Sequence, residues 1–362
     1  MPHPSLDNKT PYVVEPLFYD DEDGDPTLVV LTKATFELHT ANQLALLEEQ
    51  PPLLTSGECY GEDPEVSSYR YEPEGMAPFK AATDVAVIGH ACAPKPRTTA
   101  VDVGLQVGPL RKVARVFGER LWFKGVGAFQ LSAPHPFEKI PLTYERAFGG
   151  WDRSPANADH HRVEARNPVG RGFHTRHSAV ETEDYAPNIE SINALISGYR
   201  DTPAPVGFGF TSPHWQPRAK YAGTYGELWD KTRKPRLPTD FDVRHFSAAS
   251  EGLLAQGYLR GDESVQSVGL SPRGEVRFGL PGLPPPQVRA VIADKPDPVF
   301  TPRLDTVILD FDQQRVTLFW RCRTKLSEGP HDVAEIAVES PESLKYPRIF
   351  TDDGESQRPA AN

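Results

Sequence analysis

Proline is the feature that most constrains the fold of this chain, because it occurs 37 times along 362 residues and is joined by 28 glycines. Each proline fixes its own φ angle and removes a backbone donor, so it ends or kinks any helix that it interrupts. Long uninterrupted helices are therefore not expected. The composition favours many short strands joined by well-defined loops, which is typical of a mainly β protein.

Strand patterns are strongest in three regions of the chain, namely residues 12–39, 84–131 and 257–321. Their apolar residues alternate or are rich in β-branched types. The second region has the pattern of a meander, with a three-residue hairpin connection at Gly118–Arg120. The sequence predicts a mainly antiparallel, two-sheet sandwich-like architecture with a few short helices and long ordered loops.

Helix signals are few and short. Residues 188–198 carry apolar side chains at helical spacing between an asparagine and a glycine. Thr224 and Glu227 have the spacing of a capping box, which predicts a helix that ends before Pro235. A third helix is predicted from about Phe241 to Ala255.

The organisation along the chain predicts one domain over residues 1–345. This domain can be divided into two β subdomains, at about 1–150 and 205–345, that are joined by a loop-rich middle. Residues 346–362 form a polar tail that we expect to be mobile.

Charge and cysteine content narrow the class of function. The net charge is −11, which disfavours nucleic acid as a partner, and residues 1–75 hold 16 acidic but only 3 basic side chains. This acidic flank is either a solvated face or a patch that steers a basic partner. No membrane span or secretory signal is visible, and three cysteines without paired spacing suit a reducing compartment. We therefore expect a cytoplasmic protein that does not bind membranes.

Motifs for nucleotide binding, for a serine nucleophile elbow and for zinc peptidases are missing from the sequence. Histidines cluster at Asp159–His161 and His174–His177, but an arginine within the second group opposes a cation, so ordinary surface histidines are the better interpretation. His90 and Cys92 lie two apart on a predicted strand, which is too far for a catalytic dyad. We predict neither a metal site nor a cofactor.

Paired carboxylates are the remaining route to catalysis. Asp240 and Asp242 form one pair, and Glu145 and Asp152 form another. A glycosidase needs two such groups at a fixed separation. Asp240 is equally suited to capping a helix. No residue is predicted to be catalytic.

Arginine and large aromatic residues instead concentrate in the loops, together with glycine and proline. Such residues dominate protein-binding hot spots, although they also cover a core beneath loops. Both interpretations stay open at this point. The candidates for partner binding are Arg146, Phe148, Trp151, Arg171, Phe173, Phe208, Trp215, Arg218, Tyr225 and Trp229.

These loops also carry a resemblance to a known family. The runs are YERAFGGWD (144–152), NPVGRGF (167–173), PVGFGF (205–210), WQPR (215–218), AGTYGELW (222–229), RLPTDFDVRHF (236–246), GYLRGDE (257–263) and LDTVILDFDQQRVTLFWR (304–321). In order and spacing they resemble a bacterial domain-of-unknown-function family over roughly residues 10–325. One departure is Gly226, which stands where the family pattern has an aspartate.

Members of that family are typically encoded in type VI secretion loci, beside PAAR-repeat spike-tip proteins, the spike trimer and toxins. The resemblance therefore implies an adaptor or chaperone that helps to load a toxin on the spike. Its partners would be the toxin, the PAAR protein, or the spike trimer. It implies no catalytic residues.

Three hypotheses follow. The first is the non-enzymatic adaptor or chaperone. The second is a glycan- or lipid-binding β module that uses Trp151, Trp215 and Trp229. The third is a hydrolase that uses Asp240, Asp242 or Glu145.

Overall fold

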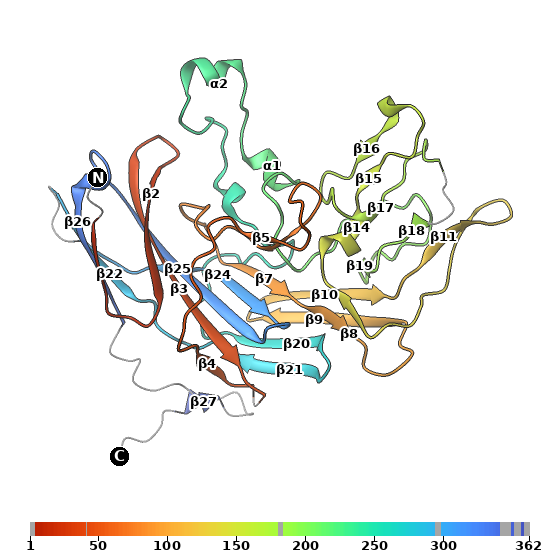
Figure 1. Ribbon diagram of the computed structural model, residues 1–362, viewed down its shortest axis with the longest axis horizontal. Helices are drawn as coiled ribbons and strands as arrows, with labels where there is room; N and C mark the ends of the chain where they lie inside the picture. The colour runs from red at the N-terminus through yellow and green to blue at the C-terminus, as the bar shows by residue number, and fades with distance from the viewer. Residues whose placement is uncertain are drawn as a thin grey trace.

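A computed structural model describes residues 4–40, 42–179, 184–293, 298–340, 349–350 and 356–357. A long twisted sheet runs through the centre of the molecule (Figure 1). Its strand order is β2-β3-β25-β24-β7, with β4 also paired to β3, and all pairs are antiparallel except β24 with β7. The strands are β2 (Val13–Asp20), β3 (Pro26–Leu38), β4 (Leu44–Leu46), β7 (Asp84–Ile88), β24 (Arg303–Asp310) and β25 (Arg315–Lys325).

Two smaller sheets lie side by side on one face of the central sheet (Figure 1). The first has the order β1-β26-β22-β23 and the second β19-β10-β9-β20-β21. The first contains β1 (Ser5–Asn8), β22 (Gln287–Ile292), β23 (Val299–Phe300) and β26 (Val333–Glu339). The second contains β9 (Ala100–Val107), β10 (Leu110–Phe117), β19 (Ile189–Glu190), β20 (Ser264–Ser271) and β21 (Gly274–Gly279).

Strand β3 shows how the sequence produces these layers. Side chains alternate between the two faces of a strand. In β3, Leu28 and Val30 pack on the first small sheet, while Ala34 and Phe36 pack on the second. The opposite face of the central sheet carries a further set of buried apolar residues, such as Leu31 and Phe319, next to buried charges such as Lys33, and loops cover it.

Short strand pairs and helices build the loop-rich parts. The pairs and the one triplet are β5 (Glu58–Cys59) with β6 (Tyr69–Tyr71), β8 (His90–Cys92) with β13 (Lys139–Pro141), β11 (Leu121–Lys124) with β12 (Phe129–Leu131) and β18 (Asp184–Tyr185), β14 (Phe148–Gly149) with β17 (Arg171–Gly172), β15 (Trp151–Asp152) with β16 (Arg162–Val163), and β27 (Ile349–Phe350) with β28 (Ser356–Gln357). The helices are α1 (Arg218–Tyr221) and α2 (Glu227–Thr232), and the 3-10 turns are η1 (Tyr144–Arg146), η2 (Ala158–His160), η3 (Val243–Phe246) and η4 (Pro330–Asp332).

The prediction of a mainly β, mostly antiparallel and sandwich-like protein is confirmed. The predicted strand region 257–321 contains the antiparallel pairs β20–β21 and β24–β25. The meander over residues 84–131 was wrong, because β7 joins the central sheet and β11 pairs with β12 and β18 instead of β10. Gly118–Arg120 therefore connects two different sheets.

The helix predictions were largely wrong. Residues 188–198 form β19 and a turn instead of a helix. Helix α2 exists and ends before Pro235, but its N-cap is Gly226, because the Thr224 hydroxyl donates to Asp240. Only the turn η3 forms in the third predicted helix.

The central sheet contains strands from both predicted subdomains, about residues 1–150 and 205–345, because β25 and β24 lie between β3 and β7. Within the described residues, no helix has the length and apolar character that crossing a membrane would require. The predicted mobile tail at 346–362 lies outside the described residues, apart from β27 and β28.

Candidate protein-binding surface

The YERAFGGWD and NPVGRGF motifs lie side by side and hold each other in place. Strand β14 of the first motif pairs in parallel with β17 of the second. The amide nitrogen of the fully buried Asn167 side chain donates to the carbonyl oxygens of Tyr144 (2.8 Å) and Phe148 (2.9 Å). A Cβ atom on Gly149 would lie 2.2 Å from the Asn167 carbonyl oxygen, so the two backbones can approach only at a glycine. Close backbone packing thus explains much of both motifs.

Two predicted binding residues, Arg146 and Arg171, fix these motifs to the connection between β10 and β11. Arg146 forms an ion pair and hydrogen bond with Glu119, and Arg171 donates to the other oxygen of the same carboxylate at 2.8 Å. Both guanidinium groups also donate to the side-chain oxygen of Asn188. These contacts explain why the connection is no hairpin turn, since its carboxylate anchors the loops.

A fully buried ion pair between Arg120 and Glu190 lies beside that anchor. The Arg120 guanidinium stacks on the Phe117 ring at 4.0 Å and also donates to a backbone carbonyl. Glu190 in turn accepts the backbone amide of Ile196 at 2.8 Å. Sequence reasoning missed Arg120, and it assigned Glu190 to a helix that does not form.

An aromatic cluster lies beneath the motif loops. It includes two predicted binding residues, Phe148 and Phe173, whose ring centroids lie 6.2 Å apart, together with Trp122 and Tyr199. Phe148 is buried and Phe173 is half-buried. The cluster is a small core of its own, and it supports the loops from below.

The outer side of these loops presents Trp151, which is 50% exposed, and β18 presents Tyr185, which is 45% exposed. The Arg153 guanidinium stacks over the Trp151 ring at 4.6 Å, and Arg171 lies over Tyr185 at 5.5 Å. These residues line or flank a shallow depression of about 510 Å³. Exposed aromatic rings with stacked guanidinium groups are typical of binding surfaces. We call these four residues the Trp151 surface.

Asp152 holds this surface in place from within. Its carboxylate accepts hydrogen bonds from the hydroxyls of Ser154 (2.7 Å), Thr175 (2.7 Å) and Ser178 (2.6 Å). Burial alone would raise the pKa of Asp152, but these donors stabilise the charged form and lower the pKa to about 2. The carboxylate therefore stays charged and acts as an anchor for the loop.

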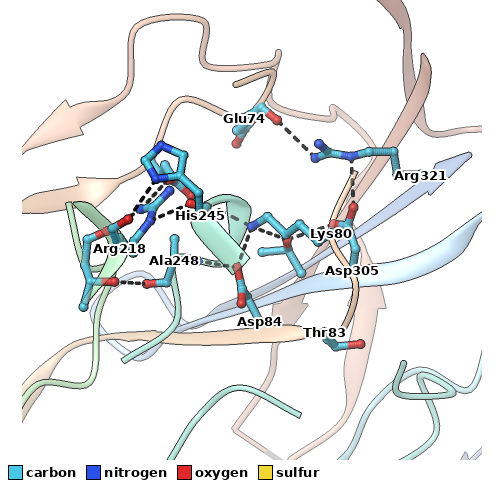
Figure 2. Close-up of polar contacts among 12 residues, drawn as sticks. Glu74, Lys80, Thr83, Asp84, Arg218, His245, Ala248, Asp305 and Arg321 are labelled. Carbon is cyan, nitrogen blue, oxygen red and sulfur yellow. Dashed lines mark hydrogen bonds and ion pairs between the residues drawn. The ribbon is translucent and has the colours of Figure 1, made fainter. Parts of the chain in front are cut away.

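A second group of predicted residues, Phe208, Trp215 and Arg218, is also buried. Phe208 belongs to the core between the central sheet and the second small sheet, and Trp215 packs edge-on against Tyr144 at 5.1 Å. The Arg218 guanidinium lies 2.8 Å from the Glu72 carboxylate and donates to the carbonyl oxygen of His245 at 3.0 Å (Figure 2). These contacts attach the segment around α1 to the loop that precedes β7.

Arg218 belongs to a cluster of buried charges that Figure 2 shows in part. Lys80 lies 2.7 Å from Asp84, and Arg321 lies 2.9 Å from Asp305. Burial raises the pKa of Glu74, while its partner Lys33, 2.7 Å away, counters this effect. The cluster has four cations and four anions, each with a side chain no more than 9% exposed: Lys33, Lys80, Arg218, Arg321, Glu72, Glu74, Asp84 and Asp305.

The balance of charge in this cluster indicates a structural role. Burying a charge is costly unless an opposite charge and hydrogen bonds compensate it, and each charge here has a partner. Asp84, for example, also accepts the backbone amide of Ala248 at 2.8 Å. The cluster thereby joins the covering loops to the sheet.

Helix α2 projects from the molecule beside β2 (Figure 1). On it, the Trp229 indole donates to the carbonyl oxygen of Arg236 at 2.8 Å and packs edge-on against Tyr225. Tyr225 is 53% exposed and Leu228 is 77% exposed, so the projection presents apolar side chains to the surroundings.

The carboxylates of the hydrolase hypothesis each have local hydrogen-bond partners. The Glu145 carboxylate accepts hydrogen bonds from the backbone amide (2.6 Å) and the hydroxyl (2.8 Å) of Ser68. Hydrogen bonds from Thr224 lower the pKa of Asp240, and those from Arg244 lower the pKa of Asp242. A general acid needs the opposite shift, so this arrangement does not favour acid catalysis by the aspartates.

The predicted histidine clusters are arranged by stacking. His160 and His177 stack at 4.1 Å, and His174 stacks on Tyr199 at 3.9 Å. In the part of the chain that the structure describes, one group of three ligand-type residues comes together, namely Glu328, His331 and Asp332 at η4. None of these three belongs to the predicted histidine clusters.

The ten predicted binding residues thus fall into three groups. Four are buried and form contacts within the protein: Phe148, Phe208, Trp215 and Arg218. Four are partly buried: Arg146, Arg171, Phe173 and Trp229. Two are exposed, Trp151 and Tyr225, and they lie on separate surfaces. Sequence reasoning missed Arg153 and Tyr185, although Arg153 follows the WD of the first motif.

Residues 23–321 match the model of a family described as uncharacterized proteins conserved in bacteria (DUF2169). The chain belongs to this family. The match covers most of the chain, and it includes the loop motifs and the central sheet from β3 to most of β25. No curated protein and no solved structure matches the chain. DUF2169 membership confirms the resemblance at the level of a bacterial family of unknown function.

Proposed function

We propose that this DUF2169 protein is a non-enzymatic adaptor or chaperone. It binds a type VI secretion toxin, a PAAR spike-tip protein, or both, and helps to load the toxin on the spike. The observation that carries the proposal is the Trp151 surface, where exposed aromatic rings and stacked guanidinium groups flank a shallow depression. The family resemblance supplies the secretion context.

The rigidity of this surface supports a binding role. Hydrogen bonds of the Asp152 and Asn167 side chains fix the loops that carry Trp151, so little conformational freedom has to be lost when a partner binds. Exposed tryptophan and arginine are the residue types most often found at the centre of protein interfaces.

The test is co-expression of the full chain with the toxin and PAAR protein encoded beside it, followed by size-exclusion chromatography. We expect co-elution at a fixed stoichiometry and a toxin that is insoluble alone. The double variant Trp151→Ala/Arg153→Ala should lose the complex, while the matched variant Tyr225→Ala, in the loop before α2, should keep it. Separate elution of well-folded wild-type components would contradict the proposal.

A glycan-binding module is the second candidate, because Trp151 and Tyr185 lie next to a depression lined by Asp152, Asp184 and backbone of glycine-rich loops. Trp215 is buried and therefore cannot serve as a stacking platform on this surface. Titration of the protein with a glycan panel, followed by tryptophan fluorescence, distinguishes this candidate. A spectral shift that Trp151→Phe abolishes would favour it over the adaptor.

A further inference from the structure

A second depression, of about 640 Å³, lies beside the β8–β13 pair and shares no lining residue with the depression of the Trp151 surface. Its wall is formed by the segment that follows β8, by the residues that precede β13, and by Pro272 from the β20–β21 turn. The two depressions can therefore be occupied independently.

Three cations line this depression: Lys95, Arg97 and Lys139. Across the described ranges of the chain, none of them forms an ion pair, and the one acidic lining residue, Glu138, forms none either. All four side chains belong to exposed residues. Exposed positive charge that has no ion-pair partner attracts anionic groups.

The backbone at Arg97 is a second, independent observation. Lys95 to Thr98 form a turn in which the amide of Thr98 donates to the carbonyl oxygen of Lys95 at 3.4 Å. Pro96 precedes Arg97, whose φ is +63°. A turn with proline second and a positive φ third prefers glycine at the third position. An arginine in this position is strained, and strain of this kind is often found at functional sites.

Backbone hydrogen bonds fix this turn to the segment that precedes β13. The backbone amide of Phe137 donates to the carbonyl oxygen of Thr98 at 3.0 Å, and that of Ala93 donates to Glu138 at 2.9 Å. The rest of the lining is largely apolar: Pro94, Pro96, Pro136, Phe137 and Pro272. The depression thus combines a cationic rim with an apolar wall.

We propose that this depression is a docking site for an acidic, partly apolar peptide segment of a partner protein. Carboxylate side chains of the segment would pair with Lys95, Arg97 and Lys139, while its apolar side chains would pack on Phe137 and the prolines. The complementary charges give orientation and a fast encounter. This second site goes beyond the Trp151 surface and would let the protein hold two partners at once.

The test uses the full chain and a short fluorescein-labelled peptide of alternating glutamate and leucine, with fluorescence anisotropy as the readout. A matched peptide with glutamine in place of glutamate is the control for apolar binding. We expect the glutamate peptide to bind more tightly than the glutamine peptide, and to bind more weakly as salt rises. The triple variant Lys95→Gln/Arg97→Gln/Lys139→Gln should lose about tenfold in affinity.

Arg97→Gly separates binding from folding. Glycine adopts a positive φ without strain, so this variant should keep the thermal midpoint of the wild type or raise it, while its affinity for the glutamate peptide falls. Equal binding of the two peptides, or unchanged affinity in both variants, would overturn the proposal. A single-stranded oligonucleotide that binds more tightly and displaces the peptide would also overturn it. Trp151→Ala should leave peptide binding unchanged, so failure here is distinct from failure of the proposed function.

Discussion

Replacement of Asn167 by alanine tests whether the NPVGRGF motif serves structure. The substitution removes the two hydrogen bonds that the side chain donates to the carbonyl oxygens of Tyr144 and Phe148. A buried hydrogen bond contributes about 1 kcal/mol net, and a buried carbonyl left without a partner costs about 1–3 kcal/mol. The Tyr144 carbonyl keeps the backbone amide of Ala147 as a partner, so its loss is the smaller one. We therefore expect the free energy of unfolding to fall by about 2–4 kcal/mol.

Urea unfolding followed by tryptophan fluorescence measures this change. Asn167→Asp should be more damaging than Asn167→Ala, because it places a carboxylate oxygen against two carbonyl oxygens. Asn193→Ala is the matched control, since that residue is exposed and should change the free energy of unfolding by less than about 0.5 kcal/mol. A loss below about 1 kcal/mol for Asn167→Ala would refute the reasoning, because it would mean that the buried amide is not what holds the two motifs together.

Three other residues give sharp tests. The pKa of Asp152 is about 2 in the folded chain against 3.8 ordinarily, which gives about 2 kcal/mol of stability above about pH 4 that is lost as the pH falls toward 2. Asp152→Asn should flatten this part of the curve of unfolding free energy against pH, and an unchanged slope would contradict the assignment. Arg120→Met should lower the free energy of unfolding in urea by roughly 3–5 kcal/mol, because it leaves Glu190 buried without its cation. Arg120→Met/Glu190→Met should recover much of that loss, and a double variant no more stable than the single one would argue against a stabilising ion pair. Burial raises the pKa of Cys322 to about 12, so its alkylation by iodoacetamide at pH 8 should be far slower in the native protein than in urea. Mass spectrometry measures the two rates, and equal rates would contradict this prediction.

The alternation of side chains along the sequence was sufficient to predict strands in which one face carries the apolar residues. In β3, the residues at even positions from Leu28 to Leu38 face one side, and their apolar side chains pack on the small sheets. The opposite face could not be predicted. Lys33 on that face is buried because Glu74, which is distant in the sequence, lies 2.7 Å from it. Alternation gives the period of a strand, whereas pairing of distant charges is a property of the tertiary structure.

The helix predicted at residues 188–198 failed for a related reason. Ile189 and Ile196 are buried as the pattern requires, but Ile192 and Leu195 are more than 40% exposed. Glu190, between them in the pattern, pairs with an arginine that lies in another part of the chain. Contacts of this kind override a short helical periodicity, because isolated helices of that length are marginal.

The candidate site could be predicted only in part, because arginine and aromatic residues have two uses in these loops. Arg218 and Trp151 belong to the same type of motif, yet one is buried in the charge cluster and the other is exposed beside a depression. No property of the single sequence separates them. Arg97 was missed altogether, because only the backbone conformation shows that it occupies a position that suits glycine.

The loop motifs contain some residues that stabilise the fold and others that are exposed, and this difference determines how binding should be tested. Asn167 and Arg120 have roles in stability, so their variants would lose a partner simply because the loops no longer fold. Trp151, Arg153 and Arg97 are different, since their side chains are exposed. If these three variants lose binding while their free energy of unfolding is unchanged or increased, the loss is caused by the altered surface and not by unfolding. If Trp151→Ala and Arg97→Gly each abolish a different contact, one chain carries two separate binding sites, which is what an adaptor that holds two partners requires.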